Sequence, residues 1–153
     1  MGLAIVHSRA RVGVRAPEVR VEVHLAGGLP AMSIVGLPEA AVREAKDRVR
    51  AAIQCAQFEF PARRITINLA PADLPKDGGR FDLAIALGIL AASGQLSTAA
   101  LEGWEFLGEL ALTGEIRPVD GVLAAAIAAG EAGRRLLVAP GNGAEAALAS
   151  TVE

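Results

Sequence analysis

Residues 68–94, NLAPADLPKDGGRFDLAIALGILAASG, contain the two features that decide the fold. The first is a proline-rich loop, residues 71–79, which ends in the turn Lys76-Asp77-Gly78-Gly79. The second is an almost wholly apolar segment, residues 83–92, and a helix that is apolar on every side is a buried helix. We therefore predict that residues 83–92 form the central helix of the core, with Asp82 as its N-cap. A glycine-rich turn at a helix N-terminus is a common place for an anion site or a nucleophile.

The segments on either side of this stretch alternate apolar and polar residues, which predicts β-strands. The clearest strand is residues 18–25. Residues 31–35 follow it after a Gly-Gly-Leu-Pro turn as its expected partner, so we predict an opening β-meander. The other expected strands are residues 3–6, 12–14, 64–69, 105–110 and 136–139, with residues 111–119 as a turn and a short extended arm.

Three further segments have helical patterns. Residues 39–57 have an apolar stripe and a charged outer face, residues 122–130 are rich in alanine, and a last helix starts at about residue 140. This order of elements predicts an α+β fold, with a mixed β-sheet and packed helices. We expect residues 1–153 to form a single domain. Because the last helix has no stop signal, we also expect the chain to be a fragment of a longer protein.

Composition limits the setting and the partners. The chain is 52% hydrophobic and has one cysteine, so we expect a globular domain without disulfides in the reducing cytoplasm. We find no signal peptide and no apolar run of membrane-spanning length, so no membrane contact is expected. The net charge of −2 argues against a strongly basic nucleic-acid surface but leaves a local basic face open.

Several kinds of catalytic or cofactor site have no counterpart in the sequence. The phosphate-binding pattern G-x-x-x-x-G-K-[ST] is absent, so we expect no ATP hydrolysis by this chain. His7 and His24 are isolated and Cys55 falls on the apolar side of its helix, so we expect no metal site. Neither histidine lies near a Gly-rich serine turn, as a Ser-His-Asp triad would require. We therefore predict no catalytic residue and no cofactor in this chain.

The turn and a later segment resemble Lon-type proteases. The matching stretches are Pro75-Lys76-Asp77-Gly78, Leu107-Gly108-Glu109-Leu110 and Pro118-Val119-Asp120-Gly121-Val122. In those proteases a serine at the helix start is the nucleophile and a lysine on a later helix is its base, because a lone hydroxyl is a poor nucleophile. On this sequence the serine position falls on Arg80 and the lysine position on Ala125. The resemblance implies a Lon-like fold without peptidase activity, in which Asp77, Arg80 and Ala125 are degenerate protease positions.

A resemblance to the ComM/YifB family, also called magnesium-chelatase-like proteins, covers nearly the whole chain. It is carried by residues 35–39 (VGLPE), 46–50 (KDRVR), 67–75 (INLAPADLP), 78–83 (GGRFDL), 113–119 (TGEIRPV) and 121–123 (GVL). The resemblance implies a Lon-protease-like fold, also described as ribosomal protein S5 domain 2-like. It further implies a hexameric AAA+ ATPase motor outside this chain, with ATP and Mg bound there. The parent helicase is expected to act in DNA branch migration during natural transformation and recombination.

Three basic groups are candidates for contact with DNA. Lys76 and Arg80 flank the turn beside a helix N-terminus and could hold a backbone phosphate. Alternatively, Arg80 pairs with Asp77 or Asp82 and fixes the loop, since local ion pairs are common at such turns. The second group is Arg43, Lys46 and Arg50. Acidic residues share its helix face, so a solvated surface is the simpler interpretation. The third group is Arg9, Arg11 and Arg15.

We therefore predict a non-catalytic module that helps a ComM-type hexameric motor through DNA contact or ring assembly. The alternative is a protein–protein or regulatory module without DNA contact, which the net negative charge fits equally well. A Lon-like peptidase is a remote third hypothesis, because its nucleophile and base cannot be placed. Salt-sensitive binding would separate the first two, since phosphate contacts release counterions and apolar contacts do not.

Overall fold

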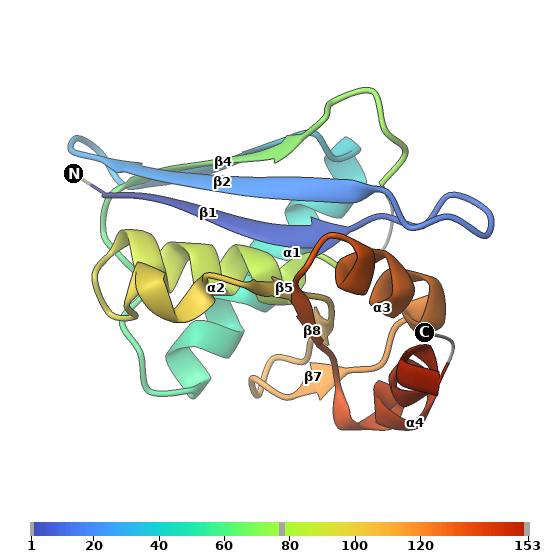
Figure 1. The fold of residues 1–153 in the computed structure, drawn as a ribbon. Coiled ribbons are helices and arrows are strands. Elements are labelled where there is room, and N and C mark those ends of the chain that lie inside the picture. Colours follow the sequence, from blue (N-terminus) through green and yellow to red (C-terminus); the bar gives the residue numbers. More distant parts are fainter. Residues whose placement is uncertain (1, 77–78, 152–153) are drawn as a thin grey trace.

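Six strands build one mixed β-sheet in the order β3-β4-β2-β1-β5-β8. The computed structural model describes residues 2–76 and 79–151 (Figure 1). The strands of this sheet are β1 (Gly2–Arg9), β2 (Glu18–Ala26), β3 (Ala31–Val35), β4 (Arg64–Ala70), β5 (Trp104–Phe106) and β8 (Arg135–Leu137). The pairs β1–β2 and β2–β4 are antiparallel, whereas β3–β4, β1–β5 and β5–β8 are parallel. The predicted α+β class with a mixed sheet is confirmed, and the arrangement is consistent with the Lon-like fold that the resemblance implies.

The helices are α1 (Glu39–Cys55), α2 (Asp82–Ala92), α3 (Val122–Glu131) and the short α4 (Gly143–Ala147). Short 3-10 helices cover Thr98–Leu101, Pro140–Asn142 and Leu148–Thr151. Among the described helices, none has the length and the apolar character needed to cross a bilayer. Three predicted helices, over residues 39–57, 83–92 and 122–130, form within two residues of their expected bounds.

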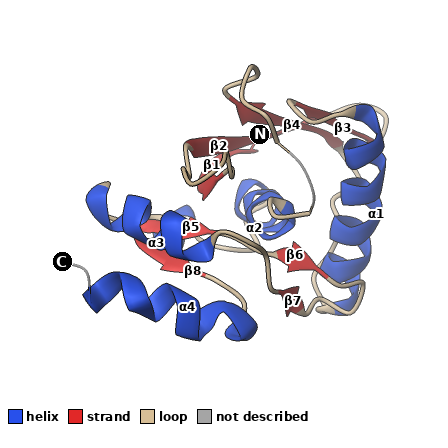
Figure 2. Ribbon diagram, turned by 90° about the vertical axis from the view of Figure 1, so that its right-hand side faces the viewer, coloured by secondary structure: helices blue, strands red, loops and turns tan. Residues whose placement is uncertain are grey.

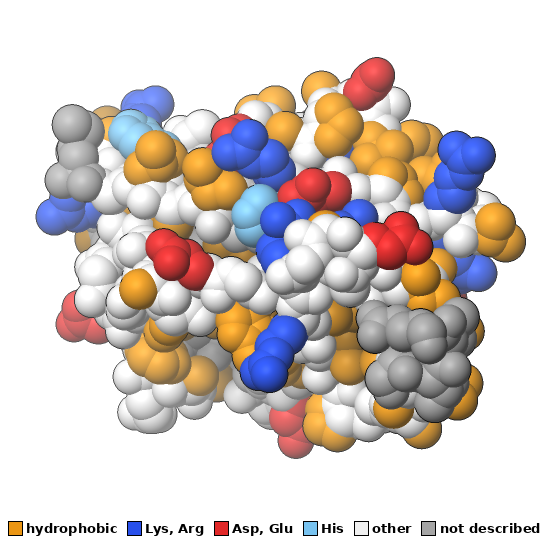
Figure 3. Space-filling view, viewed as in Figure 1, with side chains coloured by type: hydrophobic (Ala, Val, Ile, Leu, Met, Phe, Trp, Pro, Cys, Tyr) orange, Lys and Arg blue, Asp and Glu red, His pale blue; other side chains and the backbone are white. Residues whose placement is uncertain are grey.

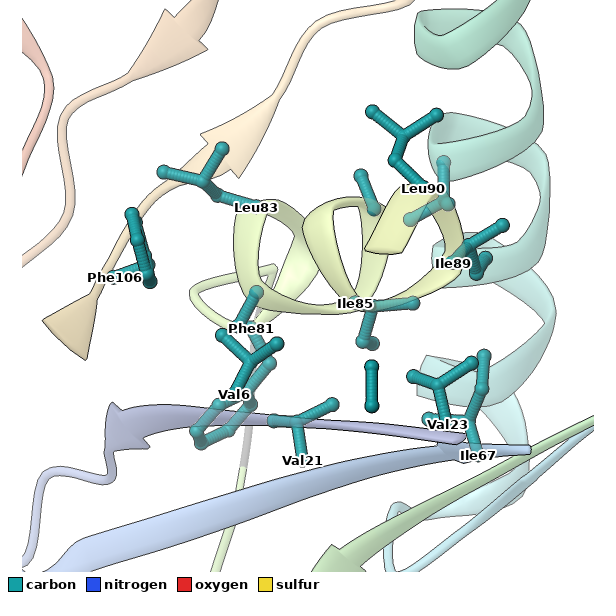
Figure 4. Packing of buried hydrophobic residues seen from close by; sticks show 14 of the residues in the cluster. Val6, Val21, Val23, Ile67, Phe81, Leu83, Ile85, Ile89, Leu90 and Phe106 are labelled. Atoms are coloured by element: carbon teal, nitrogen blue, oxygen red, sulfur yellow. The ribbon is translucent and has the colours of Figure 1, made fainter. Parts of the chain in front are cut away.

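Helix α2 is the centre of the core, as its all-round apolar sequence predicts. Seen end-on in Figure 2, it has β1, β2 and β4 of the sheet on one side and α1, β5 and β6 (Glu109–Leu110) around the rest. Ile85 and Ile89 are fully buried; Ile85 points toward the sheet, where Val23 and Ile67 lie, and Ile89 points toward α1 (Figure 4). Gly88 lets the helix approach closely, because a Cβ atom there would lie 2.5 Å from a methyl group of Val23.

The predicted β-meander is wrong, because β3 does not pair with β2. Both edges of β2 are occupied, one by β1 and the other by β4. Strand β3 instead runs parallel to β4, from the pair Ala31↔Arg64 to Val35↔Asn68. A partner 30 residues away in the chain thus replaces the sequence neighbour, which adjacency alone cannot reveal.

Two other predicted strands also differ. Residues 12–14 form no strand, and Val12 makes only a bridge to Arg15. The strand predicted over residues 105–110 is split between β5 and β6, and β6 pairs with β7 (Ile116–Arg117) in a separate two-stranded sheet. The reason is the start of α2: Gly108 N–H donates to the carbonyl of Arg80, and Leu83 N–H donates to that of Gly108.

Cys55 is exposed, so its predicted place on the apolar side of the helix is wrong.

A buried ionic cluster joins the end of β1 to β5 and to the turn after α3. Glu105 is fully buried, and its two carboxylate oxygens accept from Arg9 Nε and Nη2 at 2.7 and 2.8 Å. Arg134 Nε donates to the same carboxylate at 2.9 Å, and Arg134 Nη2 reaches Glu18 at 2.7 Å. Buried charges are tolerated when paired in this way. The cluster fixes the end of β1, from which the candidate site is built.

Candidate functional site

The loop between β4 and α2 places its two cations in different clefts. One cleft, of about 580 Å³, is lined by Arg80, Gly79, Glu109 and Asp120 among others, and we call it the Arg80 cleft. The other, of about 660 Å³, is lined by Lys76, Asp73 and residues 36–38 at the start of α1, and we call it the Lys76 cleft. Arg11 lines both clefts. Lys76 and Arg80 therefore do not share one pocket, contrary to the single phosphate clamp that the sequence suggested.

Arg80 is buried and ties three segments together. Its Nε donates to the carbonyl of Arg9 at 3.1 Å, and its Nη1 donates to the carbonyl of Asp120 at 3.0 Å. Only 6% of the residue is exposed. The end of β1, the start of α2 and the segment before α3 thus meet at one guanidinium. The predicted pairing of Arg80 with Asp77 lies outside the described residues.

Asp82 does not cap α2, although we predicted that it would. It also does not pair with Arg80, which was one of the pairings that we considered. It is the first residue of the helix, after Phe81 at the N-cap. Its carboxylate accepts a hydrogen bond from Arg48 Nε of α1 at 2.6 Å and another from the backbone N–H of Leu110 at 3.1 Å. Burial raises the pKa of Asp82, and the hydrogen bond from Arg48, which lowers this pKa, opposes that shift. That hydrogen bond in turn raises the pKa of Arg48. This pair could not be predicted from the sequence, because its two members are 34 residues apart.

Lys76 is also buried, with 5% of the residue exposed. Its Nζ donates to the carbonyl of Leu74 at 3.0 Å. Burial lowers the pKa of Lys76, and the nearby charge of Asp73 opposes this shift. Lys76 lines the same cleft as residues 36–38, which lead into α1, and the first N–H groups of a helix carry a partial positive charge. This cleft therefore combines two sources of positive potential with one acid, Asp73.

Ala125 is fully buried in α3, within an apolar cluster that includes Ala16, Leu107 and Val122. A lysine amine at this position would lie among hydrocarbon side chains. Among the described residues that line the Arg80 and Lys76 clefts, there is no serine, threonine or cysteine. Asp77, the third degenerate protease position, lies outside the described residues.

The second basic group stays apart from these clefts. Arg43 and Arg50 of α1 are exposed and Lys46 is half-buried. Arg50 stacks over the ring of Phe60, 4.4 Å from the ring centre. None of the three lines the Arg80 cleft or the Lys76 cleft. The structure thus separates the five predicted contact residues into two cleft residues and three residues on the outer helix.

The third basic group divides in another way. Arg9 is buried against Glu105, whereas Arg11 and Arg15 are exposed on the loop that follows β1. Arg11 Nη1 lies 3.5 Å from Asp120, in a pair whose side chains are 49% and 88% exposed. Exposed pairs of this kind contribute roughly 0–1 kcal/mol. Arg11, which we grouped with Arg9 and Arg15 in the sequence, is therefore a cation that can exchange its partner for a phosphate at little cost.

Comparisons with known proteins agree with the resemblance. The family model for subunit ChlI of Mg-chelatase matches residues 21–142. The chain is 59% identical over 150 residues to competence protein ComM of Haemophilus influenzae, and 57% identical over 150 residues to YifB of Salmonella typhimurium. It is also 56% identical over 142 residues to YifB of Escherichia coli. These alignments cover 98%, 98% and 93% of this chain, but only 30%, 30% and 28% of the relatives, so the chain spans less than a third of their length.

Proposed function

Because this chain belongs to the magnesium-chelatase-like ComM/YifB family, we propose that it is a non-catalytic module that contacts DNA for an AAA+ motor in a longer protein. The motor is a hexameric ATPase that binds ATP and Mg and drives branch migration as a helicase. The word "competence" in the name of the Haemophilus influenzae relative supports a role in natural transformation. In this proposal the module has no cofactor of its own and acts in the cytoplasm.

The observation that carries the proposal is the lining of the two clefts at the old protease position. Cations line both clefts, namely Arg11, Lys76 and Arg80, and no hydroxyl or thiol nucleophile is present among their described lining residues. Protein donors of this kind hold nucleic-acid backbones through phosphate oxygens. Two acids, Glu109 and Asp120, line the Arg80 cleft as well, which supports modest affinity. The contacts between cations and phosphates would make that affinity depend on salt.

Within the proposal, the cations differ in role. Arg80 donates to two backbone carbonyls and holds the walls of its cleft in place. Arg11 is exposed and only weakly paired, so it supplies the contact to phosphate. Lys76 lines the Lys76 cleft and adds positive charge to it. The outer face of α1, with Arg43, Lys46 and Arg50, has no part in it.

The test is fluorescence anisotropy of this chain with labelled single-stranded and forked DNA across a salt series. We expect binding at low salt that weakens steeply as salt rises. Arg11→Gln should reduce the affinity, and Arg43→Gln on the outer face of α1 should leave it unchanged. No binding of the wild-type chain at low salt, or equal effects of the two variants, would contradict DNA contact through these clefts.

A protein–protein module is the second candidate function. Leu3 and Ile5 of β1 are 62% and 39% exposed, and Val35 of β3 is 52% exposed. These aliphatic side chains favour a subunit contact on the sheet, as ring assembly would need. Concentration-dependent self-association in analytical ultracentrifugation, lost in Leu3→Ser, would support this candidate.

Peptidase activity is tested separately with a fluorophosphonate probe, which reacts covalently with activated serines. We expect no labelling of the native chain beyond that of the heat-denatured chain. Labelling that depends on the native fold would contradict the non-catalytic proposal.

A further inference from the structure

The loop between β1 and β2 is a narrow hairpin that projects beyond the sheet, at the right of Figure 1. Val12 and Arg15 exchange two backbone hydrogen bonds of 3.0 Å, so the turn itself consists of Gly13 and Val14 alone. Below them, Ala10 N–H donates to the carbonyl of Pro17 at 2.9 Å. Gly13 has a φ of +62°, which is the left-handed region that glycine adopts readily. We call residues 11–15 the hairpin tip; its hydrogen bonds hold it in one conformation.

The hairpin tip combines exposed aliphatic and cationic side chains. Val14 is 92% exposed and Val12 is 37% exposed. Arg11 and Arg15 are exposed on either side of them, in the sequence Arg-Val-Gly-Val-Arg. In Figure 3, blue and orange side chains alternate at the edge where this loop projects. The tip itself has no acid. Asp120 is weakly paired to Arg11, Glu109 and Asp73 each line a cleft that Arg11 also lines, and Glu18 is held by Arg134 and His7.

We infer that the hairpin tip is a wedge for forked DNA, with Val14 against the terminal base pair of the fork and Arg11 and Arg15 on the flanking phosphates. This inference rests on the proposed function and deepens it. Proteins that unstack duplex DNA insert an aliphatic side chain at a base step and hold the backbone with cations. The tip has both, on a turn of two residues. Two residues of the tip, Arg11 and Gly13, line the Arg80 cleft, so a strand leaving the fork would enter a cleft with two cations.

A protein partner fits the same tip less well. A stable protein interface buries about 800 Å² per partner around a central apolar cluster. The tip offers two exposed valines on a single turn, flanked by two guanidinium groups. A fork, in contrast, presents one exposed base-pair face between two phosphate backbones, which matches one aliphatic group between two cations.

The first test compares a forked duplex with a duplex whose two ends are closed by hairpin loops, so that it exposes no terminal base pair, by anisotropy with this chain and at the same number of phosphates. Val14→Ser should weaken binding to the fork about fivefold and leave closed-duplex binding unchanged, because it removes only the contact with the open base pair. Leu29→Ser is the matched control, since Leu29 is 82% exposed on the turn between β2 and β3. The double variant Arg11→Gln/Arg15→Gln should weaken both complexes and lower the salt slope by about 2, since each lost phosphate contact removes about 0.9.

Two outcomes separate this inference from the function on which it rests. If the wild-type chain binds no DNA, both are wrong. If it binds but Val14→Ser acts equally on the fork and the closed duplex, or no more than Leu29→Ser, the wedge alone is wrong.

A second measurement locates the tip in the complex. Benzoylphenylalanine in place of Val14 should cross-link to the fork strand within a nucleotide or two of the junction. A cross-link to a second copy of this chain instead would overturn the wedge in favour of a subunit contact.

Discussion

At position 80 a guanidinium lies in the interior, where Nε and Nη1 donate to the carbonyls of Arg9 and Asp120. A lysine has one ammonium and cannot reach both carbonyls with the same geometry. We predict that Arg80→Lys lowers the free energy of unfolding by about 1–3 kcal/mol, the cost of leaving buried polar groups unsatisfied. Urea denaturation measures this, with Arg43→Lys as the exposed control. A loss no larger than that of the control would show that Arg80 does not hold the three segments together.

Lys76 predicts a dependence of stability on pH. Burial lowers its pKa in the native state below the ordinary value of 10.5, so between these two values the unfolded chain binds more protons than the native chain. The free energy of unfolding therefore rises with pH through that window, and the penalty is fully present below it. In Lys76→Met this rise is absent.

The measurement is urea denaturation of the wild-type chain and Lys76→Met between pH 7 and pH 10.5. The wild-type chain should gain stability relative to the variant as the pH rises, because the two proteins differ only at Lys76. A constant difference between the two proteins across this range would show that the Lys76 amine is solvated in the native state.

At the scale of elements, the close approach of α2 to the sheet depends on Gly88. A Cβ atom there would lie 2.5 Å from Val23 Cγ2, in a tightly packed region. We predict that Gly88→Val costs about 1–3 kcal/mol through overpacking and that Gly88→Ala costs less, since alanine regains about 1 kcal/mol of helix propensity. Val23→Ala removes the opposing methyl group. The double variant Gly88→Ala/Val23→Ala should therefore lose less than the sum of the single variants in urea denaturation. Additive losses would contradict this contact.

Local patterns were sufficient for most elements but not for their partners. The apolar run of α2, the stripe of α1 and the alternation of β2 and β4 all follow from side-chain periodicity, and each forms close to its expected bounds. The pairing of β3 with β4 does not, because it depends on which edge of β2 is already occupied. The break between β5 and β6 likewise arises from hydrogen bonds to the start of α2.

The same limit applies to the candidate site. The charged turn before α2 is visible in the sequence, and both of its cations line clefts. The burial of Arg80 cannot be seen in the sequence, because it depends on the carbonyls of Arg9 and Asp120, which are distant in the chain. Arg11 belongs to a basic group that we noted, but only the fold shows that it lies between the two clefts.

At the scale of the whole molecule, two apolar clusters meet at the ionic cluster of Arg9, Glu105 and Arg134. The larger cluster lies between the sheet, α1 and α2, and the smaller one lies beneath α3. We predict that Glu105→Gln weakens the attachment of the smaller part, since the buried guanidinium of Arg9 and the half-buried one of Arg134 lose this counter-charge. Amide hydrogen exchange should then accelerate at least about tenfold more in α3 and β8 than in β4, through local unfolding. Glu102→Gln, at an exposed site nearby, is the control. A uniform loss of protection would show that the chain unfolds only as one unit.

In our proposal, DNA contacts this molecule at the hairpin tip and at the two clefts beside it. The most direct measurement is a titration of the isotope-labelled chain with forked DNA, followed by backbone amide chemical shifts. We predict the largest shifts at residues 11–15, then around Lys76, Gly79 and Asp120, all reversed by high salt. Shifts confined to the outer face of α1 around Arg43 and Lys46, or no shifts at low salt, would contradict the claim.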